Sequence, residues 1–228
     1  MANNSTAGYG CRQTMTVGNT PATGGQSEFT VQGGGSPGAT KAIFKGAPVA
    51  MQTAAGGAGV LGHIQDQTAA LMTDGIVGGN TWAHNTANTN GSLGVFNGAT
   101  FVDANGKPTW TNGLAAAQTS STDYNTGSSD ITAFVNTNPH QEYTARADAA
   151  VVIASFNTLT NTGFNLNDAG AGVDGQSDCT LDIANTTGTA NYMWKLVRSA
   201  NVTNQNDLTA AGADIIISYN PQANAYLA

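Results

Sequence analysis

The segment ANYMWKLVR, at residues 190–198, has the two-residue period of a β-strand. Side chains of an extended chain point alternately to the two faces of a sheet, which puts Tyr192, Trp194 and Leu196 on the same face. Lys195 points to the opposite face. Large apolar side chains that share one face need a core to cover them. The segment therefore predicts a strand with Trp194 in the core.

Short apolar segments of the same kind recur on both sides of this strand. We predict closing strands at residues 179–183 (CTLDI) and 214–219 (DIIISY), and earlier strands at residues 28–32, 42–44, 48–52, 59–64, 130–136 and 141–145. Residues 148–158 fit either a short helix that begins at Asp148 or a strand through the apolar residues 151–153. Many strands and few helical patterns predict an all-β fold: a small β-barrel or β-sandwich with long loops and an extended N-terminal arm.

Two Asn-Gly pairs lie close together in the middle of the chain. In residues 94–102 (GVFNGATFV) the pair Asn97–Gly98 separates two apolar runs. Asn-Gly readily adopts the positive φ angles of a type I′ turn, so we predict a β-hairpin there. Residues 103–108 (DANGKP) predict a second turn, after which residues 109–111 are expected to be extended again.

The first forty residues differ from the rest in composition. Gly, Thr, Ser and Asn dominate them, and only the EFTVQ segment at residues 28–32 alternates like a strand. A segment with so few apolar residues gains order by lying on a partner's surface. We therefore predict an extended N-terminal arm at residues 1–40 and a β-rich domain at residues 41–228. Deletion of the arm is expected to leave that domain folded.

Charge and hydrophobicity limit the class of partner. The chain has 228 residues with a net charge of −7, and only 9% of them are charged, against roughly 25% in ordinary globular proteins. With 40% hydrophobic residues the chain is expected to fold, and with few cations it is not expected to bind nucleic acid. No signal peptide and no apolar run of about 20 residues is found, so no membrane partner is expected. Cys11 and Cys179 are expected to be free thiols, with a single bridge as the alternative.

Residues that carry chemistry do not form a recognisable motif. His63, His84 and His140 are far apart in the sequence, and residues 33–41 (GGGSPGATK) lack the Gly-Lys pair of a phosphate loop. Asp168, Asp174 and Asp178 lie in a glycine-rich segment that is interpreted as a solvated turn or as a weak calcium loop. We therefore predict no catalytic, cofactor-binding or metal-binding residues and no enzyme activity.

The tryptophans divide into two groups. Trp194 is expected in the core because its neighbours alternate. Trp82 and Trp110 lie near polar turns and are expected on an exposed contact surface, where an aromatic ring can also stack on a sugar.

A series of landmarks along the chain resembles the head decoration proteins of tailed bacteriophages, also called cement or capsid-stabilising proteins. Each landmark is a weak motif, and their order carries the resemblance. They are Gly10-Cys11-Arg12, Val17-Gly18-Asn19, residues 25–29, residues 42–49, residues 93–98, residues 131–135, Asn138-Pro139-His140-Gln141-Glu142-Tyr143, residues 147–150, and residues 215–217 with Asn220.

The resemblance implies a structural role in the virion. Such proteins are made in the host bacterial cytoplasm and bind the major capsid protein on the outer capsid surface. They typically assemble as homotrimers at three-fold or quasi-three-fold positions. Residues 1–40 are then expected to contact the capsid protein or a neighbouring copy. The alternatives are a receptor-binding or fibre-tip module that binds host glycans, and a bacterial surface or pilus-like subunit.

Overall fold

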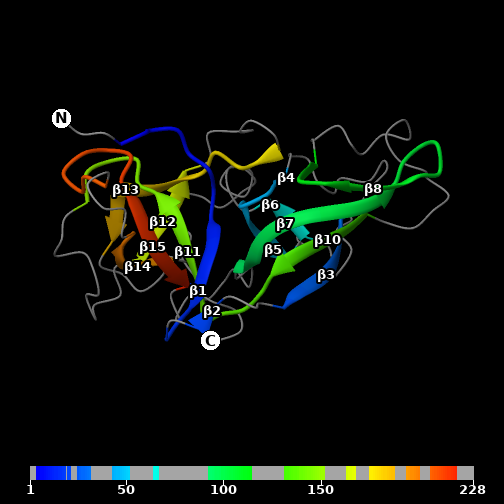
Figure 1. The fold of residues 1–228 in the computed structure, drawn as a ribbon, viewed down its shortest axis with the longest axis horizontal. Coiled ribbons are helices and arrows are strands. Elements are labelled where there is room, and N and C mark those ends of the chain that lie inside the picture. Colours follow the sequence, from blue (N-terminus) through cyan, green and yellow to red (C-terminus); the bar gives the residue numbers. More distant parts are fainter. Residues whose placement is uncertain are drawn as a thin grey trace.

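A computed structural model shows an all-β protein, as the sequence predicts. It describes residues 4–18, 20–21, 25–31, 43–51, 64–66, 92–114, 131–151, 163–167, 175–187, 194–200 and 206–219. In these stretches the chain forms β-strands and connecting loops without an α-helix. The strands form two large antiparallel sheets that lie side by side (Figure 1), consistent with the predicted barrel or sandwich architecture.

The first sheet has seven strands. Every pair in it is antiparallel. In spatial order its strands are β13 (Thr180–Thr187), β12 (Gly163–Asn167), β14 (Trp194–Ser199), β15 (Asp214–Tyr219), β11 (Gln141–Arg146), β1 (Arg12–Thr16) and β2 (Thr20–Pro21).

The second sheet is built around one long strand, β7 (Ser92–Val102). The remaining strands are β3 (Gln26–Val31), β10 (Ile131–Asn136), β5 (Pro48–Met51) and β6 (Ile64–Asp66). β8 (Pro108–Thr111) pairs with residues 99–102 of β7 and is not part of the strand order β3-β10-β7-β5-β6. A separate two-stranded ribbon joins β4 (Ile43–Phe44) to β9 (Gly113–Leu114).

The second sheet is an insertion into the first. The chain begins in the first sheet with β1 and β2, builds the second sheet from β3 to β10, and returns to the first sheet at β11. The returning connection, from β10 to β11, contacts the described residues before and after the first one. The hydroxyls of Ser27 and Thr137 are 3.0 Å apart, and the backbone N–H of Val17 donates to the carbonyl of His140 at 2.8 Å.

Each sheet has its own apolar core. In the first, the Trp194 ring stacks on Tyr219 with 4.6 Å between centroids, and Tyr143 meets both rings edge-on. Aliphatic residues from β11, β13, β14 and β15 complete this core. The second core is smaller and contains Ile43, Val49, Phe96, Ala99, Leu114, Ile131, Ala133 and Val135. Trp194 is 1% exposed, which confirms its predicted place in the core.

The predicted hairpin turn at Asn97–Gly98 is wrong. β7 runs through both residues without reversing. Phe134 pairs with Gly98 and Val135 with Phe96, so Asn97 is an extra residue in β7, and Gly98 has a φ of 135°. The Asn-Gly pair thus supplies positive φ to a β-bulge, and not to a turn. Gly98 is also needed for space, since a Cβ there would lie 2.3 Å from the Trp110 ring.

The predicted second turn, at residues 103–108, is confirmed. β7 ends at Val102 and β8 begins at Pro108. The Asp103 carboxylate accepts hydrogen bonds from the backbone N–H groups of Asn105 and Lys107, and Gly106 has a φ of 82°. The extended structure predicted for residues 109–111 is confirmed by β8.

Residues 1–40 are extended where the structure describes them, but they do not lie apart from the sheets. β1 pairs with β11 of the first sheet, and β3 pairs with β10 of the second along its whole length. The expectation that this segment is ordered by a partner's surface is therefore wrong for β1 and β3. Their backbone N–H and C=O groups obtain partners within the chain. Deletion of residues 1–40 removes strands from both sheets and is not expected to leave the rest folded.

Several predictions concern residues outside the described stretches: His63, His84, Trp82, Asp168, Asp174, the strand at residues 59–63 and the helix-or-strand alternative beyond Val151. The other predicted strands are present within one to four residues of the expected bounds. In the described part of the chain no helix is long and apolar enough to cross a membrane.

Candidate ligand cleft between the two sheets

Five segments that are distant in the sequence meet where the two sheets approach each other. The backbone N–H of Lys45 donates to the carbonyls of Asn112 and Gly175, and its own carbonyl accepts from Ser177. The N–H of Cys11 donates to the carbonyl of Gly46 at 2.8 Å, and the N–H of Gly46 donates to Phe96. Lys45 and its neighbours are therefore fixed by backbone hydrogen bonds from both sheets.

Two glycines allow the backbones of two of these segments to approach closely. Gly10 and Gly46 both have positive φ, at 71° and 90°. A Cβ on Gly10 would lie 2.9 Å from the carbonyl oxygen of Gly46. The lead into β1 and the turn between β4 and β5 thus pack backbone to backbone, and a side chain at Gly10 would force them apart.

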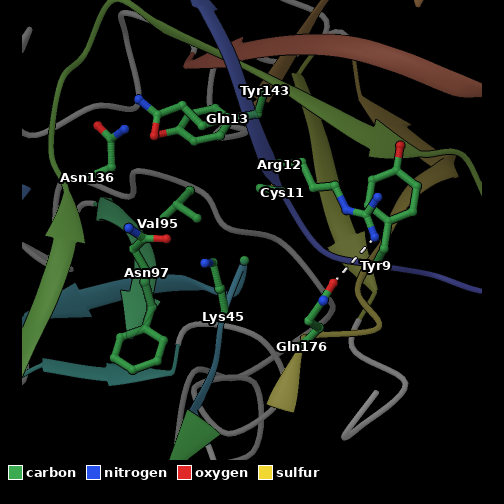
Figure 2. A pocket seen from close by; sticks show the side chains of 12 residues that line it. Tyr9, Cys11, Arg12, Gln13, Lys45, Val95, Asn97, Asn136, Tyr143 and Gln176 are labelled. Atoms are coloured by element: carbon green, nitrogen blue, oxygen red, sulfur yellow. Dashed lines mark hydrogen bonds between the residues drawn. The ribbon is translucent and has the colours of Figure 1, made fainter. Parts of the chain in front are cut away.

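A cleft of about 480 Å³ opens beside these segments. Figure 2 shows Asn136, Gln13 and Tyr143 at one end, Arg12, Tyr9 and Gln176 at the other, and Lys45 and Asn97 between them. Cys11, Val95 and Phe96 are buried lining residues. The volume lies within the range of small-ligand pockets, which is about 300–1,000 Å³.

Arg12 is placed by stacking on an aromatic ring. Its guanidinium carbon lies 4.1 Å from the centroid of Tyr9, and its Nη2 donates to Gln176 Oε1 at 3.3 Å. Tyr9 is itself fixed, because its hydroxyl donates to Asp214 Oδ1 at 3.0 Å. Burial, together with the Asp214 charge, raises the pKa of Tyr9 well above its ordinary value of 10.0, so this hydroxyl stays a donor.

The charge of Asp214 is balanced away from the cleft. Arg146 Nε donates to the same Oδ1 atom at 3.0 Å, and its guanidinium also lies 4.7 Å from the centroid of Tyr9. Both arginines therefore contact the Tyr9 ring, but within the described residues only Arg146 forms an ion pair.

Asn136 presents an unpaired donor. Its side chain is 3% exposed, and its Oδ1 accepts the backbone N–H of Asn138 at 3.1 Å. Since a backbone N–H can only donate, the atom that it meets must be the amide oxygen. The amide nitrogen then faces away from Asn138. It has no hydrogen-bond partner within the described part of the chain.

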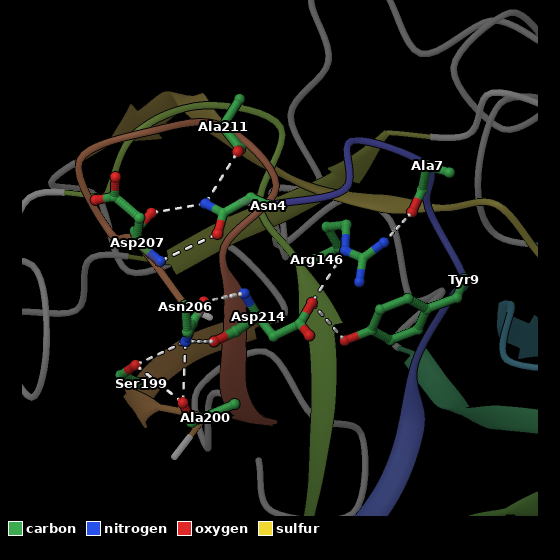
Figure 3. A network of polar contacts seen from close by, with 10 residues as sticks. All are labelled: Asn4, Ala7, Tyr9, Arg146, Ser199, Ala200, Asn206, Asp207, Ala211 and Asp214. Atoms are coloured by element: carbon green, nitrogen blue, oxygen red, sulfur yellow. Dashed lines mark hydrogen bonds and ion pairs between the residues drawn. The ribbon is translucent and has the colours of Figure 1, made fainter. Parts of the chain in front are cut away.

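The far end of the first sheet is closed by a polar network that involves the N-terminal segment (Figure 3). Asn4 donates to the carbonyls of Asp207 and Ala211 and accepts from the N–H of Asp207. Asn206 Nδ2 lies 2.8–2.9 Å from Ser199 Oγ and the carbonyls of Ala200 and Asp214. This network joins backbone groups and holds residues 4–8 against the loop before β15.

Of the described residues that were singled out for chemistry or contact in the sequence, only Cys11 lines the cleft. Trp110 is 50% exposed, as predicted, and packs on Phe134 with 5.2 Å between centroids. His140 is exposed in the connection before β11, and Asp178 is half-buried before β13. Among the described residues no three His, Cys, Asp or Glu side chains could together hold a metal ion.

Cys11 and Cys179 form no disulfide bond with each other, as predicted, and both are buried. Burial raises the pKa of the Cys11 thiol well above its ordinary value of 9.0. Cys11 therefore stays protonated at neutral pH, and a protonated thiol is a poor nucleophile. What the cleft offers is a set of positive charges and hydrogen-bond donors, which suits binding.

No protein-family model, no curated protein and no solved structure matches this chain. The resemblance to decoration proteins therefore stays a prediction, and the cleft has to be interpreted from its own residues. The sequence does not predict this site, because Arg12, Lys45 and Asn136 are far apart in the chain. The one feature of the sequence that marks the site is a glycine beside a cleft residue: Gly10 precedes Cys11, and Gly46 follows Lys45.

Proposed function

We propose that the protein is a head decoration protein of a tailed bacteriophage. In this role it binds the major capsid protein on the outer surface of the virion, as homotrimers at three-fold or quasi-three-fold positions. One observation carries the proposal: several sequence landmarks of the resemblance meet in space. Gly10-Cys11-Arg12, residues 43–49, residues 94–98 and residues 138–143 all contribute to the junction of the two sheets or to the connection beside it.

The surface beside this junction supports a protein partner. Met15 is 42% exposed and Val17 is 55% exposed, and both lie on or just after β1 near the edge that β2 forms. Exposed large apolar side chains at a sheet edge are typical of contact surfaces. A shell protein gains its effect from moderate contacts repeated over many copies.

The test is occupancy of undecorated phage heads by the purified protein. We expect hundreds of copies per head by stained gel. The double variant Met15→Ser/Val17→Ser should lower occupancy while its circular dichroism spectrum stays that of the wild type. Absence of binding by the folded wild-type protein to heads of its own phage would contradict the proposal.

A glycan-binding module is the second candidate, and Trp110 is the observation that favours it. Its half-exposed ring, supported by Phe134, resembles the aromatic platforms on which sugars stack. In this case Trp110→Ala should abolish binding to host glycans on an array, and virions should carry few copies. A decoration protein should bind heads equally well with Trp110→Ala.

A further inference from the structure

The outer face of the second sheet carries a pair of aromatic rings. Trp110 on β8 is 50% exposed, and the centroid of its ring lies 5.2 Å from that of Phe134 on β10, with 33° between the two planes. Phe134 is half-buried, whereas Ala133 and Val135 beside it in β10 are fully buried in the core. Because side chains alternate along a strand, Phe134 and the Trp110 ring lie on the face that points away from the core.

Gly98 fixes the position of the tryptophan ring. Gly98 is the residue of β7 that pairs directly with Phe134. It has no side chain, and a Cβ at this position would overlap the six-membered ring of Trp110. The Trp110 ring therefore takes the place of the missing side chain and becomes the neighbour of Phe134 on that face.

Glu28 lies on the other side of Phe134. β10 runs between β7 and β3 (Figure 1), and Phe134 pairs with Gly98 in β7 and with Glu28 in β3. Directly opposite residues of an antiparallel pair point to the same face, with Cβ atoms about 4.5–5.5 Å apart. Glu28 is accordingly exposed, whereas the next residue, Phe29, packs against the core. The side chains of Trp110, Phe134 and Glu28 thus form one row across the sheet, which we call the outer row.

The outer row has a negative charge that nothing in the described part of the chain balances. Glu28 is the only charged residue in β3, β7, β8 and β10. The ion pairs of the described residues, Arg146–Asp214 and Arg198–Glu142, both belong to the first sheet. The faces of aromatic rings also attract positive charge, and tryptophan does so most strongly. The rings and the carboxylate of the outer row therefore favour the same kind of ligand, a cation.

The exposure of the row indicates what carries the cation. A ligand that covers the row removes water from Glu28, and a cation compensates for this loss whereas a neutral sugar does not. A single ion pair or ring contact on an exposed surface is weak. A side chain of a polypeptide can bring further contacts with it, which a small free cation cannot. Arginine suits the row best, because its planar guanidinium stacks on aromatic faces.

We propose that the outer row binds an arginine side chain of a partner polypeptide, whose guanidinium lies over the Trp110 and Phe134 rings while Glu28 supplies the opposite charge. The net charge of −7 favours the approach of a basic partner. This proposal goes beyond the decoration role, because capsid binding is assigned to the surface of Met15 and Val17 beside the first sheet. The partner is a different polypeptide from the major capsid protein.

The test is a nuclear magnetic resonance titration of the isotope-labelled full chain with the blocked peptide acetyl-Gly-Arg-Gly-amide. We expect a saturable shift of the indole N–H signal of Trp110, which is assigned by its loss in Trp110→Ala. The same peptide with citrulline in place of arginine has nearly the same shape without the charge. It should bind at least five-fold more weakly. No shift with the arginine peptide, or equal binding of the citrulline peptide, would overturn the proposal.

A charge variant separates the outer row from the net charge of the protein. Glu28→Gln keeps the size of the side chain and should weaken binding of the arginine peptide about two- to five-fold, as expected for an exposed charge. Asp207→Asn is the matched control, because it removes the same charge from the loop before β15 in the first sheet. Its amide oxygen can still accept the N–H of Thr209. An equal loss with Asp207→Asn would mean that only net charge matters, and the site would be rejected.

Ring variants test the aromatic part of the row. The backbone signals of Glu28 and Phe134 report binding when the indole is absent. Trp110→Ala should abolish their shifts, whereas Trp110→Phe should retain binding at reduced affinity because a phenyl ring also attracts a cation. Unchanged binding by Trp110→Ala would contradict the proposal. If that variant does not fold, the comparison of Glu28→Gln with Asp207→Asn still decides, since both change exposed side chains.

A sugar is the other ligand that an exposed tryptophan can hold. The methyl glycosides of glucose, galactose and mannose are therefore titrated under the same conditions. We expect them to leave the Trp110 indole signal unchanged at the concentration at which the arginine peptide saturates it. A glycoside that binds more tightly than the arginine peptide would identify the row as a sugar platform and overturn the proposal.

Discussion

The two sheets place their largest side chains differently. In the first sheet Trp194 is buried between Tyr143 and Tyr219. In the second sheet the described tryptophan, Trp110, lies outside, and the core beneath is aliphatic apart from Phe96. Both tryptophans occupy strands with alternating side chains, so alternation alone does not decide which face is covered.

The two sheets also differ in how their ends are closed. Long-range hydrogen bonds from Asn4 tie the loop before β15 to the N-terminal segment, and Asn206 ties the same loop to the end of β14 and the start of β15. In the second sheet the turn after β7 is closed locally by Asp103. We therefore expect the polar contacts at the end of the first sheet to contribute more to stability than those of the turn after β7. Matched substitutions in the two sheets test this expectation.

The largest effect is expected from the tryptophans. Trp194→Ala removes a fully buried ring and should lower the free energy of unfolding by about 3–5 kcal/mol. Trp110→Ala removes a ring that is half exposed and should cost about 1 kcal/mol or less. Urea unfolding of both variants measures the difference. Equal losses would show that Trp110 is part of a core.

Two glycines give the next comparison. Gly212 and Gly106 both have positive φ, at 84° and 82°. Alanine at either position should cost about 1–2 kcal/mol for the backbone conformation. At Gly212 the Cβ would also lie 2.3 Å from the carbonyl oxygen of Ser5, whereas at Gly106 nothing lies within 4 Å. Gly212→Ala should therefore cost a further 1–3 kcal/mol or so in thermal or urea unfolding.

The third comparison is between the side-chain hydrogen bonds of Asn206 in the first sheet and those of Asp103 in the second. Asn206→Ala leaves the N–H and C=O of Asp214 and the carbonyl of Ala200 without this partner. The loss should be about 1–3 kcal/mol, because these groups are half-buried or buried. Asp103→Ala exposes its turn amides to water, and we expect about 0.5–1 kcal/mol. A larger loss for Asp103→Ala would reverse the expected order of these contacts.

The smallest expected effect is the pH dependence of stability that comes from the buried Cys11 thiol at the junction of the two sheets. Burial raises the folded-state pKa of Cys11 above its ordinary 9.0, so its contribution to stability is complete below pH 9 and is lost as the pH rises further. Above pH 9 the unfolded chain releases a proton that the folded chain retains, which lowers the free energy of unfolding by up to about 1.4 kcal/mol per pH unit. Urea unfolding from pH 8 to 10 should show a flatter decline for Cys11→Ala. An identical slope would place the thiol in contact with water.

The sequence predicted the strands well because their signal is local. Alternation identified β10, β11, β14 and β15 within about four residues, and it placed Trp194 inside. At the two Asn-Gly pairs for which turns are predicted, Gly98 and Gly106 both have a positive φ, but only Gly106 lies in a turn. Which one turns depends on β10, whose residues pair on both sides of the Asn97 bulge. That partner is more than thirty residues away in the chain.

The N-terminal segment and the cleft could not be predicted for a related reason. β1 has a weak pattern, and its order comes from pairing with β11, which follows it by more than 120 residues. The donors of the cleft come from β1, the turn after β4 and the end of β10. Only the topology brings these residues together, and no spacing in the sequence encodes it.

The interleaved path of the chain has a consequence for proteolysis. A cut in the exposed turn after Asp103 would produce two fragments, yet β1 would still pair with β11, and β7 with β10. Neither fragment contains all the strands of either sheet, so the two fragments should stay together after the cut. The cleaved molecule should therefore migrate as one species on a native gel and as two on a denaturing gel.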